Sequence, residues 1–448
     1  MAKSLAEMPG ARGHWLLGSA RDMQREAHLF VSRLCHAHGG LARFRVLNRI
    51  FVATTDVAHV RQWLVTRHER YGRSFPMRNG ALVLGPGLLT ADGDDWLQHR
   101  RMLLPPFRRG CLPPVVDATG DAVIAMQARM HGGAQIVSPT TEMRRVALDV
   151  ISRTLFSEPM RPDVADWFST MTTEALQLIF KRNYQPVPLP FGTPTADHRR
   201  LWRIKAGLDG YLGERIQARQ REARAAPQDL LDALLAARHS DTGAPLSAAQ
   251  VLSEVKTLFV AGFETSATAL TWALYCLARH PAVADAWAAE LDAVLNGRDP
   301  QWDDIARLPY LGQIVHETLR LYPPVFASVR ETLVDDEVDG YRLPRGTQCL
   351  ISIYGIHRSP RYWPEPDRFQ PDRFAPGAAW EKDAFLPFLV GKHQCIGNHF
   401  AMLEITVALA MIGQRYRIEA VDERPVGTSP QVTLAPDREI LLKFSPRP

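Results

Sequence analysis

The sequence is poor in the features that define several protein classes. Its 448 residues include only five cysteines and no C-x-x-C pair, which argues against a disulfide framework and against a structural zinc site. The net charge of +5 is small, and no run of lysine and arginine concentrates it as nucleic-acid binding would require. The N-terminus lacks the apolar core of a signal peptide. We therefore expect a protein of a reducing compartment, the cytoplasm.

Neither a repeat nor an interdomain linker divides the chain. The 30 glycines and 33 prolines are close to average usage, and 46% hydrophobic with 23% charged residues is typical of a globular protein. At roughly 150 residues per domain the length suggests about three domains, but the continuous pattern favours a single domain over residues 1–448. A domain of this size buries enough surface to enclose a large ligand away from water.

The residue patterns predict a mainly α-helical fold with a smaller β portion. Residues 42–54 alternate around Leu47-Asn48-Arg49 as a β-hairpin does; the segment before them contains proline and glycine, and no helix is predicted there. We expect the β portion at about 40–60, 326–356 and 415–445, and the helical portion at about 94–321 and 396–414. Within the first helical stretch, the periodicity predicts helices at 94–104, 114–130, 141–156, 164–179, 197–224, 229–238, 247–280, 281–296 and 310–321.

The helix predicted from Ser247 onward is long and almost free of charge. Ser247-Ala-Ala-Gln250 is a capping-box pattern, and between Lys256 and Arg279 the only charged residue is Glu264. About 20 apolar residues suffice to cross a bilayer, so a membrane-spanning helix is one interpretation. The mid-span carboxylate, the serines and threonines and the lack of a second such segment favour a buried central helix of a globular fold instead.

The segment Ala261-Gly-Phe-Glu-Thr-Ser266 within this helix combines a glycine, a carboxylate and a hydroxyl. Gly262 costs about 1 kcal/mol relative to alanine in a helix interior, and it removes a side chain where a ligand could approach the backbone. Ala261 and Thr265 are four residues apart and therefore share a face. Glu264 and Thr265 could act as a proton relay. Alternatively, the hydroxyl could bond to a neighbouring carbonyl and the carboxylate could pair elsewhere.

A second notable segment, Phe388-Leu-Val-Gly391-Lys-His393-Gln-Cys395-Ile-Gly397, places one cysteine between two glycines just before a predicted helix. The glycines predict a tight turn whose amide hydrogens point at the sulfur, and the N-terminus of the helix favours a thiolate. His393 adds a hydrogen-bond donor or a cation. Thiolates ligate redox-active iron, including haem iron, whereas an inert packed thiol is the usual state of such a cysteine.

This loop resembles the F-x-x-G-x-R-x-C-x-G loop of the cytochrome P-450 family of haem-thiolate monooxygenases. It matches at Phe388, Gly391, Cys395 and Gly397, with His393 in place of the more usual arginine. Other segments resemble family motifs in the expected order: Trp96–Arg100 (W-x-x-x-R), 261–266 (the oxygen-activation segment), Glu317–Arg320 (E-x-x-R), Arg330 ahead of the strand region and Pro371–Phe374 (P-x-R-F).

The E-x-x-R pattern is weak by itself. Glu142–Arg145 and Glu365–Arg368 also fit it, and such residues usually form a surface pair three positions apart. Glu317–Arg320 is preferred because it lies on a periodic helix followed by Leu-Tyr-Pro-Pro.

The resemblance implies a cytochrome P-450 fold with haem b between the long central helix and the helix after the cysteine loop. It implies that Cys395 ligates the iron, that Glu264 and Thr265 deliver protons by way of water, and that Gly262 leaves room for dioxygen. It implies further cofactor contacts at Ala261 and Phe388, and contacts to the haem carboxylates from Trp96, Arg100, Arg330 and His393. A charge triad behind the cysteine loop would consist of Glu317, Arg320 and Arg373.

The implied activity is insertion of one oxygen atom of O2 into a lipophilic small molecule, such as a terpenoid, fatty acid, steroid or polyketide. Arg78 and Arg182 are candidate anchors for a substrate carboxylate. The expected apolar pocket lining comprises Phe75, Met77, Leu82, Val83, Phe180, Leu258, Ala261, Val325 and Phe326.

Electrons are expected from a separate ferredoxin- or flavodoxin-type protein with its reductase, because the sequence has no G-x-G-x-x-G motif for a flavin or nicotinamide. Arg101, Arg108, Arg109 and Lys392 could form a basic patch for such a donor, or they could be solvated surface residues. A peroxide-driven peroxygenase and a non-catalytic haem-binding sensor are the alternative functions.

Overall fold

The structure is a computed structural model that describes residues 2–130, 133–185, 188–222, 228–239 and 242–447. Its helices are α1 (Ala20–Ala37), α2 (Val57–Arg61), α3 (Phe75–Leu84), α4 (Gly93–Leu103), α5 (Pro113–Arg129), α6 (Pro139–Phe156), α7 (Pro162–Asn183), α8 (Ala196–Arg221), α9 (Leu230–Ala236), α10 (Ala248–Arg279), α11 (Pro281–Leu295), α12 (Pro309–Leu321), α13 (Ile353–His357) and α14 (Asn398–Arg415). Its strands are β1 (Leu41–Val46), β2 (Arg49–Thr54), β3 (Tyr71–Arg73), β4 (Gln135–Val137), β5 (Ser328–Thr332), β6 (Asp336–Val338), β7 (Tyr341–Leu343), β8 (Gln348–Ile351), β9 (Tyr416–Ala420), β10 (Thr428–Pro430), β11 (Leu434–Pro436) and β12 (Leu442–Pro446).

The predicted mainly helical class is confirmed, and so are the helices predicted between residues 94 and 321. Their starts obey elementary rules: α5, α6, α7, α11 and α12 each carry proline in the first turn. The capping box of α10 is present, with the Ser247 hydroxyl accepting from the Gln250 amide and the Gln250 side chain accepting from the Ser247 amide. Residues 223–224 of the predicted 197–224 helix lie outside the described residues.

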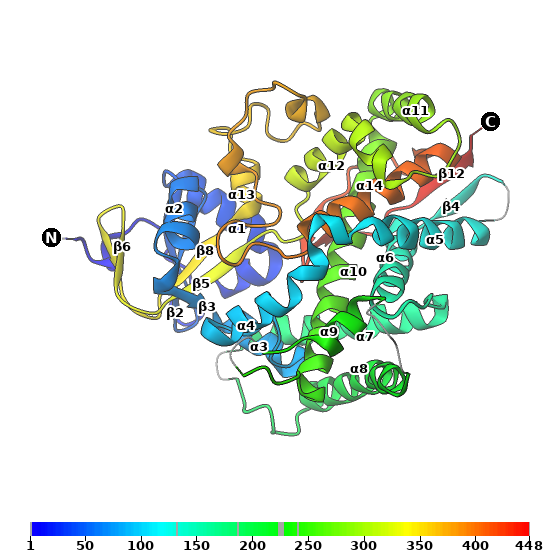
Figure 1. The fold of residues 1–448 in the computed structure, drawn as a ribbon. Helices are drawn as coiled ribbons and strands as arrows, with labels where there is room; N and C mark the ends of the chain where they lie inside the picture. Colours follow the sequence, from blue (N-terminus) through cyan, green and yellow to red (C-terminus); the bar gives the residue numbers. More distant parts are fainter. Residues whose placement is uncertain (1, 131–132, 186–187, 223–227, 240–241, 448) are drawn as a thin grey trace.

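One sheet unites the two β regions that the sequence separates. The predicted hairpin forms β1 and β2, with Val46 opposite Arg49 across a two-residue turn in which Leu47 has a positive φ. The sheet order is β1-β2-β8-β5-β3, so β8 and β5 join strands from the beginning of the chain. Figure 1 shows this sheet beside α1 and α2 and away from the bundle of helices around α10.

Helix α1, at residues 20–37, was not predicted from the sequence. Its buried positions include Met23, Ala27, Val31 and Cys35, which are four apart and line one face. The glycines at 13, 18, 39 and 40 lie outside the helix and do not interrupt it. The short α3 was also missed; it contains proline, asparagine and glycine, which disfavour helix in isolation.

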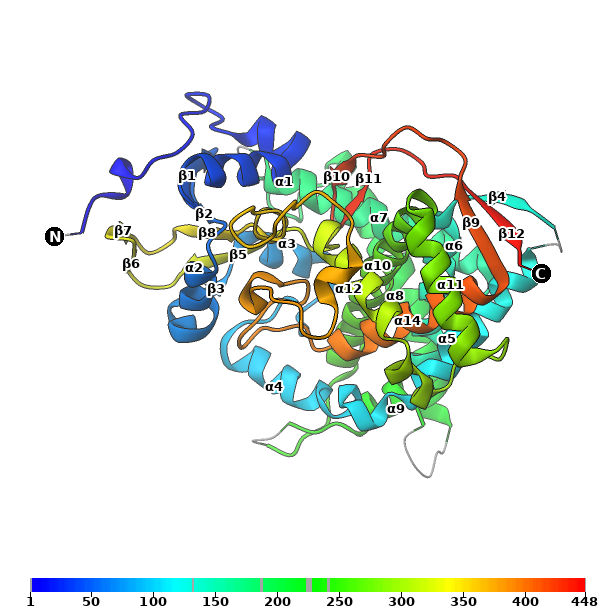
Figure 2. The same ribbon diagram turned by 90° about the horizontal axis from the view of Figure 1, so that it is seen from above.

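Helix α10 is the axis of the helical part (Figures 1 and 2). It packs against α6, α8, α12 and α14, and it is buried along most of its length. Across the described residues, no helix combines the length and apolar character needed to span a bilayer. The interpretation of residues 256–279 as a buried central helix therefore holds over the membrane-spanning alternative.

Helices α14 and α11 approach closely at a glycine. A Cβ built at Gly413 would overlap the indole ring of Trp287, which is itself buried. No atom outside the helix lies within 4 Å of a Cβ built at Gly312 in α12. A side chain at Gly413 would therefore clash with Trp287, whereas one at Gly312 would meet open space.

We expect Gly413→Ala to lower the free energy of unfolding by about 1–3 kcal/mol, because the added methyl group overpacks a rigid contact. Gly312→Ala should instead raise it by up to about 1 kcal/mol through helix propensity alone. Urea unfolding of the two purified variants measures both. Equal changes in the two variants would contradict the assigned helix contact.

Candidate functional site

The cysteine loop is a tight turn seated on residues 64–65. The Cys395 amide donates to the Phe388 carbonyl at 2.9 Å, and the Gln394 amide donates to the Gly391 carbonyl at 3.1 Å. Gly391 has φ of +77°, and a Cβ there would overlap the carbonyl oxygen of Leu64. Only glycine satisfies both conditions, so this glycine is required by the loop geometry.

Cys395 lies at the end of this loop, just before a helix. The residue carries accessible surface, although burial among surrounding protein raises the pKa of its thiol. The Gly397 amide and the Arg100 guanidinium act in the opposite direction and lower that pKa. α14 begins three residues later, at Asn398. The predicted amide and helix N-terminus are therefore in place to favour a thiolate.

Helix α10 opens at one place. Between residues 253 and 277 it is buried except at Ala261, which is exposed, and at Gly262 and Thr265, which are half-buried. The Thr265 hydroxyl donates to the Ala261 carbonyl at 2.8 Å. Ala261 and Thr265 share a face as predicted, and both carry accessible surface on it.

Glu264 points elsewhere. Its Oε1 accepts from Nη2 of Arg144 in α6 at 3.0 Å, while its Oε2 is buried without a hydrogen-bond partner. Successive helix residues are about 100° apart, so Glu264 faces α6 while Thr265 faces the open side. Both contacts that the sequence left as alternatives to a relay are present. The relay itself remains a prediction, and it needs water between the two side chains.

Gly262 is half-buried and has α6 as its neighbour. A Cβ built there would lie 3.4 Å from Cδ1 of Ile151 in α6, at van der Waals distance. The missing side chain would thus extend toward α6. The role of Gly262 in leaving room for dioxygen stays a prediction.

Several cations gather beside the cysteine loop. Arg100 donates to the Gln394 carbonyl at 2.8 Å. Trp96 is 2% exposed, and its ring centroid lies 4.0 Å from that of His393. Arg330 is 4% exposed and donates only to the Ser328 hydroxyl and the Val329 carbonyl, and burial lowers its pKa to about 10.

The electrostatics of His393 show how close these cations are. Burial, followed by the charges of Arg73, Arg330, Lys392 and Arg100, lowers its pKa to about 2. The ring is therefore neutral, and its Nδ1 is buried without a partner. Within the described residues, none of the four cations forms an ion pair with an acid.

Arg73 is a site residue that sequence reasoning missed. It lies in β3 directly opposite Arg330 in β5, and its guanidinium donates to the carbonyls of Ala91 and Leu88. Like charges directly opposite in a sheet destabilise it. No local signal marks Arg73, because the strand that brings it to Arg330 is distant in sequence.

The donor set fits a haem. A thiol lies in a turn suited to a thiolate, and a helix presents a small-residue face. Beside the loop stand the buried Arg330 and the half-buried Arg73 and Arg100, which form no ion pair within the described residues, and an unsatisfied imidazole nitrogen of His393. A group with two carboxylates would supply the charge that these cations lack.

The predicted charge triad is present behind the loop. Arg320 donates to both oxygens of Glu317 at 2.7 and 2.8 Å, and Arg373 donates to Glu317 at 3.3 Å. Glu317 and Arg320 are fully buried. Glu142–Arg145 and Glu365–Arg368 are also ion pairs, but more exposed ones, so position on the buried helix was the correct criterion.

The proposed carboxylate anchors are already engaged. Arg78 pairs with Glu331 at 2.7 Å, and Arg182 lies 3.0 Å from Nε2 of His198. Leu258, one of the expected pocket residues, faces a small cavity between α4 and α9. Because Arg78 and Arg182 already have these partners, neither is a free cation for a substrate carboxylate.

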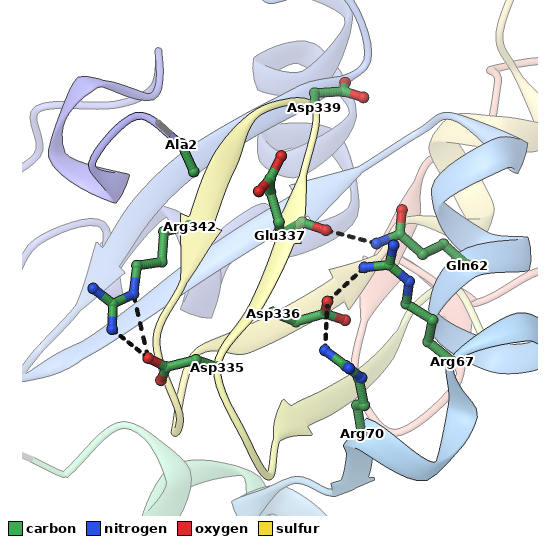
Figure 3. A pocket seen from close by; sticks show the side chains of 9 residues that line it. All are labelled: Ala2, Gln62, Arg67, Arg70, Asp335, Asp336, Glu337, Asp339 and Arg342. Atoms are coloured by element: carbon green, nitrogen blue, oxygen red, sulfur yellow. Dashed lines mark hydrogen bonds and ion pairs between the residues drawn. The ribbon is translucent and has the colours of Figure 1, made fainter.

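A pocket of about 660 Å³ opens on the surface between residues 62–70 and the β6–β7 hairpin. Figure 3 shows that its charges are largely paired: Asp336 accepts from Arg67 and Arg70, and Asp335 accepts from Arg342. The Asp336 contacts join the hairpin to residues 67–70, whereas the Asp335–Arg342 pair lies within the hairpin region. Neither the cysteine loop nor α10 contributes to the pocket lining.

Comparison with known proteins matches the chain to one family along nearly its whole length. The family model described as cytochrome P450 covers residues 8–444. The chain is 32% identical over 442 residues to cyclooctatin synthase of Streptomyces melanosporofaciens, covering 96% of this chain and 95% of that protein. It is 32% identical over 409 residues to cyclooctat-9-en-7-ol 5-monooxygenase of the same organism, covering 91% and 88%. It is also 32% identical over 389 residues to leukotriene-B4 omega-hydroxylase 3 of Mus musculus, covering 81% and 74%.

A buried carboxylic acid joins α14 to α10 one residue beyond Thr265. The Ser266 hydroxyl donates to Oε2 of Glu404 at 2.6 Å, and Oε1 of Glu404 has no partner. Burial raises the pKa of Glu404 to about 8. Glu404 is therefore neutral at pH 7, and in the unfolded chain it would be ionised.

This difference makes stability depend on pH. Because the folded pKa is the higher one, the contribution of Glu404 is complete below about pH 4.5 and is lost as the pH rises through about 8. We expect Glu404→Gln, which is neutral throughout, to flatten the decline in unfolding free energy between pH 5 and 8 by up to about 1 kcal/mol per pH unit. Urea unfolding across this range measures the slope. Glu423→Gln replaces an exposed glutamate as the control, and equal slopes in both variants would refute the assignment.

Proposed function

The chain belongs to the cytochrome P450 family and is a haem-thiolate monooxygenase, and on that premise we propose that Cys395 ligates the haem iron. The observation that carries the proposal is the thiol beside Arg100, Arg330 and Arg73, which are buried or half-buried and form no ion pair within the described residues. Bound haem supplies the activation of dioxygen. The side chains of the protein bind the haem, hold protons and place the substrate.

The haem carboxylates would bind to Arg73, Arg100 and Arg330. Each guanidinium is partly or wholly desolvated, which lowers its pKa. Trp96 and the neutral His393 would contribute hydrogen bonds without charge. Arg73, in β3, would thus bring a cation to the cysteine loop, in which His393 replaces the usual arginine.

Thr265 and Glu264 would supply protons on the open side of α10. The Thr265 hydroxyl hydrogen is engaged by the Ala261 carbonyl, which leaves the oxygen lone pairs available to a water molecule. Glu264 keeps one oxygen without a hydrogen bond. A water between the two could carry a proton from the carboxyl group toward the reacting oxygen.

The substrate is proposed to be a lipophilic small molecule that is hydroxylated. Two relatives are named for action on cyclooctat-9-en-7-ol and on leukotriene B4. Phe75, Met77 and Phe180 are half-buried apolar residues of α3 and α7, and these helices pack together. We propose that they line the substrate pocket.

A separate protein supplies electrons, and we propose an acidic ferredoxin or flavodoxin in the cytoplasm. Arg101, Arg108, Arg109 and Lys392 are exposed, and none forms an ion pair within the described residues. Phe107 contacts Phe400 of α14, which places the two arginines after it near the cysteine loop. Free surface cations favour docking of an acidic partner.

Cys395→Ser should abolish the strongly red-shifted band in the difference spectrum of the reduced protein with carbon monoxide, because that band requires a thiolate ligand. Cys111→Ser removes another exposed cysteine and should retain the band. A purified, haem-supplied protein that lacks the band, or a Cys395→Ser variant that keeps it, would refute the ligand assignment.

Thr265→Ala should uncouple electron consumption from product. We expect product per electron to fall about tenfold or more, since positioned proton transfer contributes roughly 100-fold or more in enzymes. Thr265→Ser keeps the hydroxyl and should stay close to the parent. An unchanged yield in the alanine variant would contradict the relay, and turnover with peroxide alone would favour the peroxygenase alternative.

A further inference from the structure

A buried lysine in the first half of α10 joins three helices. Lys256 is 3% exposed. Its Nζ donates to the Val83 carbonyl of α3 at 3.0 Å and to Oδ1 of Asp209 in α8 at 2.7 Å. Burial lowers the pKa of this ammonium group, and Asp209 acts in the opposite direction. Because a buried charge is costly without a paired one, the lysine is tolerated in the core only while α8 supplies Asp209.

The contact with α3 lies at the end of that helix. Since α3 ends at Leu84, the Val83 carbonyl is one of the last carbonyls, which lack a partner within the helix. A cation there also opposes the negative end of the helix dipole. The next residue, Gly85, has φ of +83°, and a Cβ there would overlap the side chain of Ser253 in α10. The end of α3 is thus seated directly on α10.

Helix α3 needs such support, because it contains proline, asparagine and glycine, which disfavour a helix. Two other polar side-chain contacts hold its first half. Asn79 donates to Asn183 of α7 at 2.7 Å, and Arg78 donates to Glu331 of β5 at 2.7 Å. Lys256 is the residue that joins its last turn to α8.

A second residue of α10 holds the segment that follows α3. The Leu88 amide donates to the two oxygens of Glu254 at 3.2 and 3.1 Å, and the His99 ring of α4 pairs with the same carboxylate. Helix α4 also carries Arg100, a proposed haem contact. Glu254 therefore holds the haem side of this segment, whereas Lys256 holds the substrate side.

We propose that Lys256 is a positioning residue for substrate binding, which fixes the last turn of α3 to α8 and thereby keeps Phe75 and Met77 in place beside the substrate. This inference rests on the proposed lining of the substrate pocket by α3. A pocket side that is already ordered loses less conformational entropy when a bulky ligand binds. Loss of the lysine contacts should therefore weaken the binding of bulky ligands and spare small ones.

The alternative is that Lys256 only stabilises the packing of α8 on α10. Both roles predict a lower free energy of unfolding without the lysine, but only a positioning role changes the ratio of affinities for large and small ligands. Two azoles provide this ratio, since each binds haem iron through a ring nitrogen. Imidazole is small, whereas clotrimazole is bulky and lipophilic and must occupy the space beside the haem.

The test uses Lys256→Met and Asp209→Asn. The side chain of Asp209 is 23% exposed, so the second variant removes the α8 contact even where the buried substitution prevents folding. Lys205→Met is the matched control, because Lys205 pairs with the same Asp209 from within α8 and is more exposed. Each haem-loaded protein is titrated with both azoles by absorption. Haem transfer to apomyoglobin and amide hydrogen exchange at residues 81–85 are measured beside the titrations.

We expect Lys256→Met and Asp209→Asn to raise the dissociation constant of clotrimazole about threefold to tenfold and that of imidazole less than about twofold, the cost of ordering one or two side chains. Exchange at residues 81–85 should be faster in both variants. Haem transfer should keep the parent rate, because Glu254 still holds the haem side. Lys205→Met should match the parent in every measurement.

Phe75→Ala separates the possible failures. A parent ratio of the two dissociation constants in Lys256→Met and Asp209→Asn, while Phe75→Ala alters it, would overturn the positioning role. A parent ratio in Phe75→Ala would refute the proposed lining by α3, and this inference with it. Faster haem transfer in Lys256→Met would show a general role in the fold and would also contradict the proposal. Absence of the carbon monoxide band from the unmodified protein would refute the haem assignment instead.

Discussion

Two arginines that face each other across paired strands, neither in an ion pair within the described residues, impose the main electrostatic constraint on the site. Arg73 and Arg330 are register partners in β3 and β5, and burial lowers the pKa of each, with Asp92 acting in the opposite direction on both. Withdrawing a guanidinium from water without a paired charge costs free energy. If the haem carboxylates bind to these arginines as proposed, they reduce that cost, and haem binding then stabilises the fold.

The same sheet explains why cations from three segments meet the cysteine loop. β3 and β5 supply Arg73 and Arg330, and Arg100 reaches the loop from α4 by donating to the Gln394 carbonyl. Gly391 lets the loop rest on the Leu64 carbonyl. These contacts join segments that are far apart in sequence. Burial and the charges of the surrounding cations keep the His393 ring neutral. The charge of the site is consequently carried by arginines and not by the histidine of the motif.

Three consecutive residues of α10 point in three directions, two of them toward neighbouring helices. Glu264 faces Arg144 on α6, Thr265 faces the open side, and Ser266 bonds to Glu404 on α14. The turn of about 100° per residue makes this division unavoidable. A relay that uses Glu264 and Thr265 must therefore pass around the helix through water. Burial leaves one oxygen of Glu264 and one of Glu404 without hydrogen-bond partners.

What could be predicted from sequence was local. The hairpin at 42–54, the capping box at Ser247 and the glycines around Cys395 each specify a conformation through neighbouring residues. Apolar residues also recur along one face of α1, but the buried polar residues His28 and Ser32 interrupt the apolar pattern of that face. Glycines flank the helix on both sides. Helix α3 contains proline, asparagine and glycine, which disfavour a helix, so its helical conformation depends on packing against α7.

The sequence by itself determined the helical class, the cysteine turn and the residue types that ligate and relay, because backbone preference and side-chain chemistry act within a few positions. Tertiary structure alone decided that Arg73 stands opposite Arg330, that Glu264 pairs with Arg144 and that Gly262 faces Ile151. Each of these depends on which face of one element meets another, and facing partners distant along the chain leave no trace in local pattern.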